Sequence, residues 1–159
     1  MNANQALINH FYTCFQKKDF RGMQECYHDE AVFSDEVFQN LSSKEVKAMW
    51  QMLIERGKDL ELTFNNVSAD AKTGKAHWEA SYTFSSTGNK VLNKIEAEFE
   101  FKDGKIYRHR DKFDFWKWTG MALGTTGKLL GWTSFLKNKV RKTANSGLQK
   151  FISRHPEFQ

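Results

Sequence analysis

Apolar residues recur at helical spacing in the first part of the chain and predict three helices. Two apolar stripes lie before and after a polar break at residues 17–19. A capping box formed by Ser42 and Glu45 opens the third helix, and Gly57 marks its end. The stripes consist of Leu7, Ile8, Phe11, Tyr12 and Phe15; of Phe20, Met23, Cys26 and Tyr27; and of Val46, Met49, Trp50, Leu53 and Ile54.

Alternation with a period of two replaces helical spacing after the third helix. Four strands are predicted at residues 60–70, 75–86, 90–101 and 105–116, with turn signals between them, and a short extended piece at 31–38 precedes the third helix. Helices followed by an antiparallel meander predict an α+β domain. By parity, Trp78, Ala80, Tyr82 and Phe84 face inward, whereas His77 and Glu79 face outward.

The register of the last hairpin follows from its apolar residues, which should share one face. A two-residue loop at Asp103-Gly104 would place glutamates beside the aromatic residues of the next strand. A three-residue loop at 102–104 avoids this mismatch and pairs Phe101 with Lys105. In this register Asp111 lies opposite Ile95.

One acid interrupts the apolar face of the last predicted strand. That face carries Tyr107, His109, Asp111, Phe113 and Phe115, and the other face is mostly charged. A carboxylate among aromatic rings loses solvation, which raises its proton affinity toward neutral pH. Two interpretations of Asp111 stay open: a carboxylate that exchanges protons, or an acid hydrogen-bonded by a neighbour as plain architecture. His109, about 7 Å along the strand, is either its partner or a histidine bonded to a carbonyl at the rim.

The composition fits one domain with a single core, since the chain has 159 residues of which 40% are hydrophobic. No apolar run approaches the roughly 18 residues of a membrane span, and the N-terminus lacks a signal-peptide pattern. We therefore expect a soluble, cytoplasmic protein. Cys14 and Cys26 lack metal-ligand spacing and are expected to be buried thiols.

Positive charge gathers at the end of the chain. Residues 117–159 contain eight Lys and Arg and a single acid, Glu157, whereas the preceding residues contain 16 basic and 18 acidic residues. An anionic surface, an acidic partner or nucleic acid could exploit such a segment, but a solvated helix face carries similar charge. We expect no nucleic-acid partner. No metal cluster, phosphate loop or nucleophile motif is present, so no metal or other cofactor is expected.

The segment 117–159 is predicted to be a basic, glycine-containing amphipathic extension of the domain formed by residues 1–116. Gly120, Gly124, Gly127 and Gly131 would permit close approach by another backbone, or belong to a partly irregular lid. An apolar stripe follows and should cover the domain formed by residues 1–116 or a second subunit, and a membrane surface is the less favoured target. The stripe comprises Trp132, Phe135, Leu136, Val140, Ala144, Leu148, Phe151 and Ile152.

The order of elements, together with the run from Tyr27 to Asp35 before the third helix, resembles the SnoaL-like branch of the nuclear transport factor 2-like superfamily over residues 5–116. The resemblance implies a strongly curved antiparallel sheet wrapped into a cone around the N-terminal helices, with a mostly apolar cavity. Ketosteroid isomerases, polyketide cyclases, limonene epoxide hydrolases and binding-only members share this fold, which does not choose among them.

Two acids match functional positions of that family. Asp35 lies where ketosteroid isomerases carry their proton-shuttling aspartate, and residues 110–114 are similar to a limonene epoxide hydrolase run whose first aspartate, here Asp111, helps to activate water. The oxyanion donors of the isomerases fall at Phe11 and Ala97, which disfavours steroid-type isomerisation. The hydrolase partner positions hold Trp78, Ala80, Phe33 and Asp35, whereas polyketide cyclases, which use few polar groups, remain compatible.

The sequence thus predicts a protein that binds a small, mostly apolar molecule in a cone and acts on it by proton transfer, as an isomerase, cyclase or hydratase. The catalytic candidates are Asp111, Asp35 and His109, and the candidate walls are Trp78, Tyr82, Phe113, Phe33 and Trp50. The alternative is a non-catalytic binding or dimerisation module whose basic tail engages a partner or an anionic surface. A homodimer through the outer face of the sheet is compatible with either.

Overall fold

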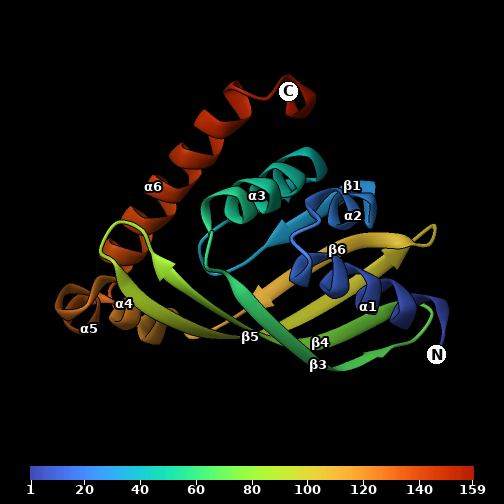
Figure 1. Cartoon of the computed structure of the whole chain (residues 1–159), viewed down its shortest axis with the longest axis horizontal. Coiled ribbons are helices and arrows are strands. Elements are labelled where there is room, and N and C mark those ends of the chain that lie inside the picture. The colour runs from blue at the N-terminus through green and yellow to red at the C-terminus, as the bar shows by residue number, and fades with distance from the viewer.

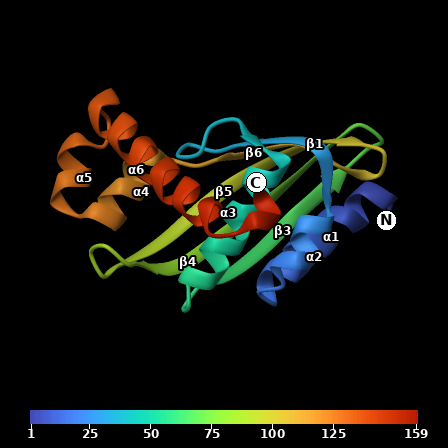
Figure 2. The ribbon, with the colours of Figure 1, turned by 90° about the horizontal axis from the view of Figure 1, so that it is seen from above.

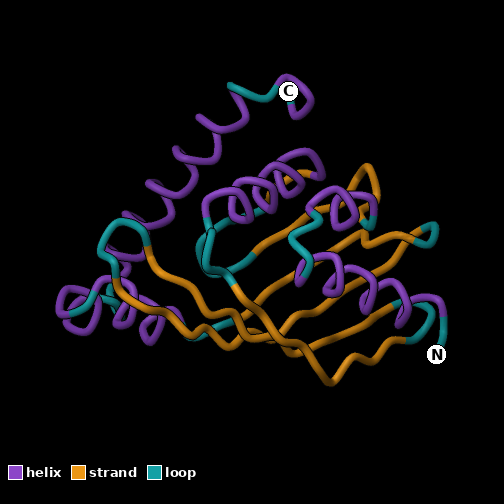
Figure 3. Tube along the Cα trace, in the orientation of Figure 1, coloured by secondary structure: helices purple, strands orange, loops and turns teal.

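The computed structural model describes residues 1–159. It contains six strands, helices that lie over one side of them, and two further helices, α4 and α5, at one end (Figures 1 and 3). The helices are α1 (Ala3–Gln16), α2 (Phe20–Glu25), α3 (Ser43–Arg56), α4 (Phe115–Leu123), α5 (Thr125–Leu130) and α6 (Ser134–Ser153), followed by the 3-10 turn η1 (Pro156–Phe158). The strands are β1 (Tyr27–Ser34), β2 (Leu41–Ser42), β3 (Glu61–Ala69), β4 (Thr73–Phe84), β5 (Asn89–Lys102) and β6 (Lys105–Lys112).

The strands form one curved sheet in the order β2-β1-β6-β5-β4-β3. All neighbours are antiparallel except β1 and β6, which pair in parallel, and the sheet stays open with β2 and β3 at its edges. Helices α1, α2, α3 and α6 lie over the same face, as the view from above also shows (Figure 2). The predicted α+β class, with a curved sheet wrapped around N-terminal helices and a helical C-terminal extension, is confirmed.

Helix boundaries follow the local signals in the sequence. The Ser42 side chain accepts a hydrogen bond from the backbone of Glu45, whose side chain accepts one in return, and the Gly57 N–H ends α3 on the Leu53 carbonyl. Asn2 forms the equivalent box at the start of α1. These caps orient α1 and α3 over the sheet, which places their apolar stripes against its inner face.

The inner face of the sheet is aromatic and its outer face is charged. Along β5 every second residue is buried, whereas Glu96, Glu98 and Glu100 are exposed. In β4, Trp78 and Ala80 are buried as predicted, and His77 points outward, where its ring contacts Glu79 and Glu96. The alternation therefore encodes the main core, which lies between this inner face and the three N-terminal helices and is extended by residues of α6 and η1.

The expected register of the last hairpin is wrong. Lys102 pairs with Lys105 across the two-residue loop that the apolar pattern had argued against, and both loop residues have positive φ, 53° at Asp103 and 74° at Gly104. An irregularity in the pairing beyond Phe101 then adds one residue to β6 and turns Tyr107 away from the core. His109 consequently lies opposite Phe99 and Asp111 opposite Ala97, not opposite Ile95.

The last strand also ends earlier than predicted. Asp114 caps α4 by accepting a hydrogen bond from the Lys117 N–H at 3.0 Å, so Phe115 and Trp116 are helical. Helices α4 and α5 meet at Gly124, whose φ of 67° and ψ of −133° are accessible to glycine. A Cβ at Gly127 would lie 1.9 Å from the Thr119 carbonyl oxygen. Gly127 thus permits a close approach of two backbones, as expected for the glycine series. The approach is between α5 and α4, both within the segment 117–159.

Helix α6 runs back over α3 and covers part of the cone (Figure 1). Leu136, Leu148, Phe151 and Ile152 are buried, as the stripe predicts. The start of the stripe does not behave as expected, because Trp132 is 69% and Phe135 73% exposed. None of the helices combines the length and the apolar character that crossing a membrane requires.

Candidate functional site

A chain of buried hydrogen bonds links α3, β1 and β6 through the core. The Trp50 Nε1–H donates to the Tyr27 hydroxyl oxygen at 2.9 Å. That hydroxyl lies 2.7 Å from His109 Nδ1, and His109 Nε2 lies 2.9 Å from Asp111 Oδ1. Asp111 is 3% exposed and His109 2%, so the sequence-predicted pair is real and is deeply buried.

Aromatic rings hold the His109 imidazole in place. Phe99 lies across it with 4.4 Å between ring centroids, and Phe33 meets it edge-on at 4.9 Å. Phe11 of α1 approaches from the helix side at 5.7 Å. These contacts leave the imidazole one orientation, in which its two nitrogens face Tyr27 and Asp111.

The protons of this chain have one arrangement that satisfies every member. Because the Tyr27 oxygen accepts from Trp50, its own O–H is free to donate to His109 Nδ1. His109 then carries its proton on Nε2 and donates to Asp111 Oδ1. Burial raises the pKa of Tyr27 well above its ordinary value, which keeps this hydroxyl protonated.

Asp111 uses one carboxylate oxygen for the protein and leaves the other without a protein donor. Oδ1 receives the hydrogen bond from His109 and a long contact of 3.5 Å from Trp78 Nε1. Oδ2 makes no hydrogen bond within the chain and is not completely enclosed. A carboxylate held in this way can take a proton from, or give one to, a group placed at Oδ2.

Asp35 repeats this arrangement in the loop between β1 and β2. Its Oδ1 accepts hydrogen bonds from the backbone N–H groups of Val37 at 2.7 Å and Phe38 at 2.6 Å, and its Oδ2 makes none. Burial raises the pKa of Asp35 to about 7, and the negative charge of Asp111 contributes in the same direction, against the lowering effect of the two backbone bonds. The charge of Asp111 thus adds to the effect of burial in disfavouring ionisation of Asp35.

A second, smaller apolar cluster, which we call the mouth of the cone, contains Trp118, with Tyr82, Phe113 and Val37 packed against it, and Val37 follows Asp35 by two residues. The Trp118 Nε1–H donates to the Tyr82 hydroxyl at 2.7 Å, and the Phe113 and Trp118 rings are 6.3 Å apart. Burial raises the pKa of Tyr82, and the nearby charge of Asp35 adds to the effect. Trp118 is not among the residues predicted for the site, because it lies within the segment 117–159 that was expected to form the extension.

Helix α6 closes over the loop that carries Asp35. Lys137 Nζ lies 3.3 Å from Glu36 Oε2, and Arg141 Nε donates to the Glu36 carbonyl at 3.0 Å. Val37 and Val140 pack against the same apolar cluster beneath. The basic residues of the extension therefore have a structural use, which charge counting alone did not reveal.

A second residue missed by the sequence analysis is Tyr12. Its side chain is fully buried, and its hydroxyl has no hydrogen-bond partner. The ring stacks on Phe64 at 5.2 Å and lies 5.9 Å from that of Trp78. Burial raises the pKa of Tyr12 far above its ordinary range, and the charge of Asp111 adds to this. The residue was read as part of an apolar stripe, and its polar tip was the available signal.

The predicted walls divide between the core and the mouth. Trp78, Phe33 and Trp50 are buried and touch one another or His109, whereas Tyr82 and Phe113 are half-buried. A groove of about 780 Å³ lies on the outer face of the sheet, lined by charged residues that include Arg108, Arg110, Glu98 and Glu100. Of the candidate residues, His109 alone borders that groove. No three His, Cys, Asp or Glu side chains converge as metal ligands.

Comparison with known proteins agrees with this geometry. Residues 8–109, well over half of the chain, match the model of the SnoaL-like domain. No protein with a curated description matches the sequence.

Three solved structures of similar fold show how widely the architecture is shared. TsrD from Streptomyces laurentii is 18% identical with a TM-score of 0.63, covering 75% of this chain and 93% of its own. An LEH-like epoxide hydrolase of M. tuberculosis is 16% identical with a TM-score of 0.61, covering 80% and 96%. TerC, co-crystallised with polyporic acid, is 16% identical with a TM-score of 0.60, covering 71% and 92%. At these identities the likeness concerns the fold.

Proposed function

Because this chain belongs to the SnoaL-like family, we propose that it binds a small, mostly apolar molecule at the mouth of the cone and moves a proton on it. The observation that carries the proposal is the paired design of the two acids. Asp111 and Asp35 each spend Oδ1 on hydrogen bonds from the protein and keep Oδ2 for a ligand. Trp78 and His109 contact Asp111, and Val37, two residues from Asp35, packs against the apolar cluster of the mouth.

The two acids have distinct roles in this proposal. Asp111 is held by His109 and acts as the base, taking a proton from a C–H or O–H of the ligand at Oδ2. Asp35, whose pKa of about 7 keeps both of its protonation states populated at neutral pH, returns a proton to a second atom of the ligand. His109 and Tyr27 are positioning residues, because they orient Asp111 without reaching the ligand. Isomerisation can consist of such a pair of transfers, whereas cyclisation adds the formation of a ring bond and hydration the addition of water.

The surroundings of the acids favour a ring-shaped, largely apolar ligand that carries a polar group. Tyr82 and Phe113 are half-buried at the mouth, and Trp78 lies at the inner end beside Asp111. The unpartnered Tyr12 hydroxyl is a donor in the same interior. Polyporic acid, with which TerC was co-crystallised, makes aromatic hydroxyquinones a rational first ligand class.

A two-part experiment tests this proposal. Quenching of tryptophan fluorescence by hydroxyquinones and aromatic acids, including polyporic acid, measures binding. NMR detection of solvent deuterium entering the bound ligand measures proton transfer. We expect Asp111→Asn to slow the exchange at least about 100-fold, the usual size of a general acid-base contribution, with a much smaller change in affinity. Asp29→Asn, an exposed change on β1, is the matched control.

The outcomes separate the candidate functions. Binding with exchange that depends on Asp111 supports the proposal. Exchange that persists in Asp111→Asn refutes the assigned role, and failure of every ligand to bind refutes the site.

A second candidate function is a binding module without turnover. The packing of Trp50, Phe33 and Trp78 against the hydrogen-bonded chain favours it, since a purely structural network would also be fully satisfied. Ligand binding with no exchange in the unmodified protein would decide for this candidate.

The outer groove between the charged rows of β5 and β6 is the surface we assign to a homodimer, which sedimentation of the Arg110→Glu variant tests.

A further inference from the structure

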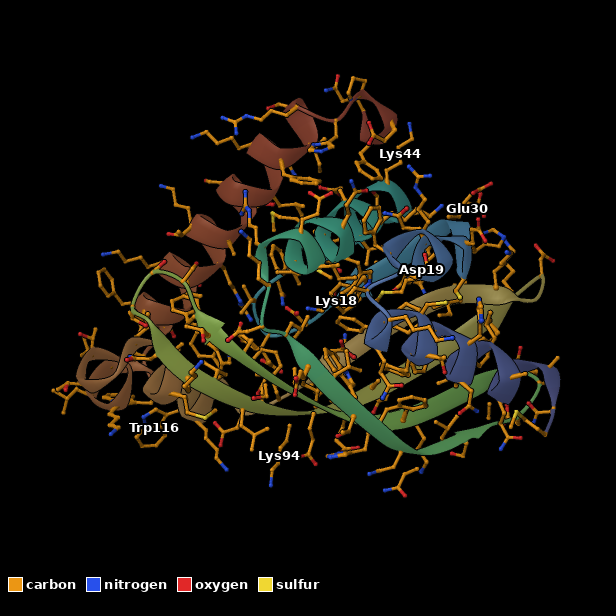
Figure 4. All side chains as sticks on the ribbon, in the orientation of Figure 1. Lys18, Asp19, Glu30, Lys44, Lys94 and Trp116 are labelled. Carbon is orange, nitrogen blue, oxygen red and sulfur yellow. The ribbon has the colours of Figure 1, made fainter.

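Large apolar side chains stand in solvent at one end of the molecule. We call these residues the apical patch: Trp116 (52% exposed), Leu129 (65%), Leu130 (43%), Trp132 (69%) and Phe135 (73%). They come from α4, α5, the turn between α5 and α6, and the first turn of α6, at the end of the long axis opposite the N-terminus (Figures 1 and 2). Trp116 projects away from the helices that cover the sheet (Figure 4).

Hydrogen bonds of the indole rings tie this surface together. Trp116 Nε1–H donates to the Lys128 carbonyl at 3.0 Å, and Trp132 Nε1–H donates to the Leu129 carbonyl at 3.0 Å. Phe135 follows Trp132 by three residues, at the start of α6. The patch is therefore an ordered surface. Its indole N–H groups donate to backbone carbonyls of the chain, and its apolar ring faces point outward.

The surroundings of the patch are mostly positive. Residues 115–154 contain eight Lys and Arg and no Asp or Glu. Lys117, Lys128, Lys139 and Lys142 are exposed, and none of them takes part in a salt bridge. Phe135, Lys139 and Lys142 follow one another at spacings of four and three, so they share one face of α6.

Two acids that contact α4 and α6 are already engaged. Asp114 caps α4, and Glu36 pairs with Lys137. The exposed lysines that form no salt bridge are therefore available to an anionic partner from outside the chain.

We propose that the apical patch docks this protein on the surface of an anionic lipid bilayer. Exposed Trp, Phe and Leu enter the headgroup region, where rings with an apolar body are favoured, while the unpaired lysines meet anionic headgroups. A second copy of the chain is a poor occupant, because it would bring the same positive charges against each other without acids to neutralise them. This inference does not depend on the ligand of the cone.

The contribution of the lysines to membrane binding and its dependence on salt can both be estimated. A lysine near an anionic leaflet strengthens binding about 5-fold. Reversing Lys139 and Lys142 to glutamate should therefore weaken binding at least about 25-fold. The electrostatic part should also fade at high salt, because the screening length falls from about 10 Å at 0.1 M to about 3 Å at 1 M.

Co-sedimentation of the full chain with vesicles tests the proposal. Phosphatidylcholine vesicles are compared with vesicles that contain 30% phosphatidylserine. The test variants are Trp132→Ser with Phe135→Ser, and Lys139→Glu with Lys142→Glu. Leu92→Ser, exposed on β5, and Lys58→Glu with Lys72→Glu, also exposed, are the matched controls. Thermal unfolding verifies that every variant folds.

We expect the unmodified protein and both controls to bind the phosphatidylserine vesicles, and both test variants to lose most of that binding. Absence of binding by the unmodified protein overturns the proposal, and so does equal binding by the test variants. A third outcome also overturns it: a dimer in solution that Trp132→Ser with Phe135→Ser dissociates and that ignores vesicles would assign the patch to a second copy.

Discussion

Replacing Asp35 by asparagine should stabilise the protein at high pH and leave it unchanged at low pH. Burial holds the pKa of Asp35 at about 7 in the folded chain, against an ordinary value of 3.8. Between these values the folded state binds more protons than the unfolded state, so stability is fully present below about pH 4 and is lost as the pH rises through about 7. Asparagine keeps an oxygen for the backbone N–H groups of Val37 and Phe38 and carries no charge.

The magnitude follows from the shift. One pKa unit corresponds to about 1.4 kcal/mol, so a shift of roughly three units sets an upper limit of about 4 kcal/mol at pH 8. Because the loop can relax and admit water once Asp35 ionises, we expect a gain of about 2 kcal/mol for Asp35→Asn at pH 8 and none at pH 4.

Urea unfolding of the two proteins from pH 4 to 8.5 measures this difference, and the shared contributions of all other groups cancel. Asp29→Asn, at an exposed position of the strand that leads into the same loop, should follow the unmodified protein throughout. Parallel curves for Asp35→Asn and the unmodified protein would show that Asp35 is hydrated and would remove it from the proposed mechanism.

Three further substitutions probe the packing. Tyr27→Phe leaves the Trp50 N–H without an acceptor and His109 Nδ1 without a donor, and should cost about 2 kcal/mol in urea unfolding; an unchanged midpoint would contradict the hydrogen-bonded chain. Tyr12→Phe removes a hydroxyl without a partner and should be neutral or stabilise by about 1 kcal/mol, so a clear loss would reveal a partner for that group. Gly127→Ala should cost at least about 2 kcal/mol, since its Cβ would meet the Thr119 carbonyl, whereas Gly120→Ala, whose Cβ has its nearest neighbour at 3.4 Å, should be tolerated; equal stabilities would refute the close approach.

Features set by short-range patterns were predictable from the sequence. The capping box at Ser42 and the alternation along β5 each depend on neighbouring residues, and both are present as expected. The burial of Asp111 followed from the same alternation. The hydrogen bond between His109 and Tyr27 could not be predicted in this way. Tyr27 lies 82 positions away and reaches β6 through the parallel pairing of β1, which no local sequence pattern indicates.

Two errors have identifiable physical causes. Ile106 and Tyr107 are both apolar, so parity could not say which of them faces inward, and one extra residue in β6 allowed a tight turn that simple alternation had excluded. Trp132 and Phe135 fit the helical stripe of α6, but the start of that helix extends beyond the part of α3 that it covers. Periodicity identifies the apolar side of a helix and does not say how far its partner extends.

The contacts of α6 with Glu36 affect the protonation of the neighbouring residue, Asp35. Since Lys137 and Arg141 hold the loop and Val140 packs over the cluster that contains Val37, release of α6 would hydrate Asp35 and favour its ionised form. By reciprocity, protonation of Asp35 must tighten the attachment of α6 by the same free energy. The attachment of α6 is thus coupled to the protonation of Asp35. Hydrogen exchange of the α6 backbone amides, compared at acidic and alkaline pH, measures this coupling.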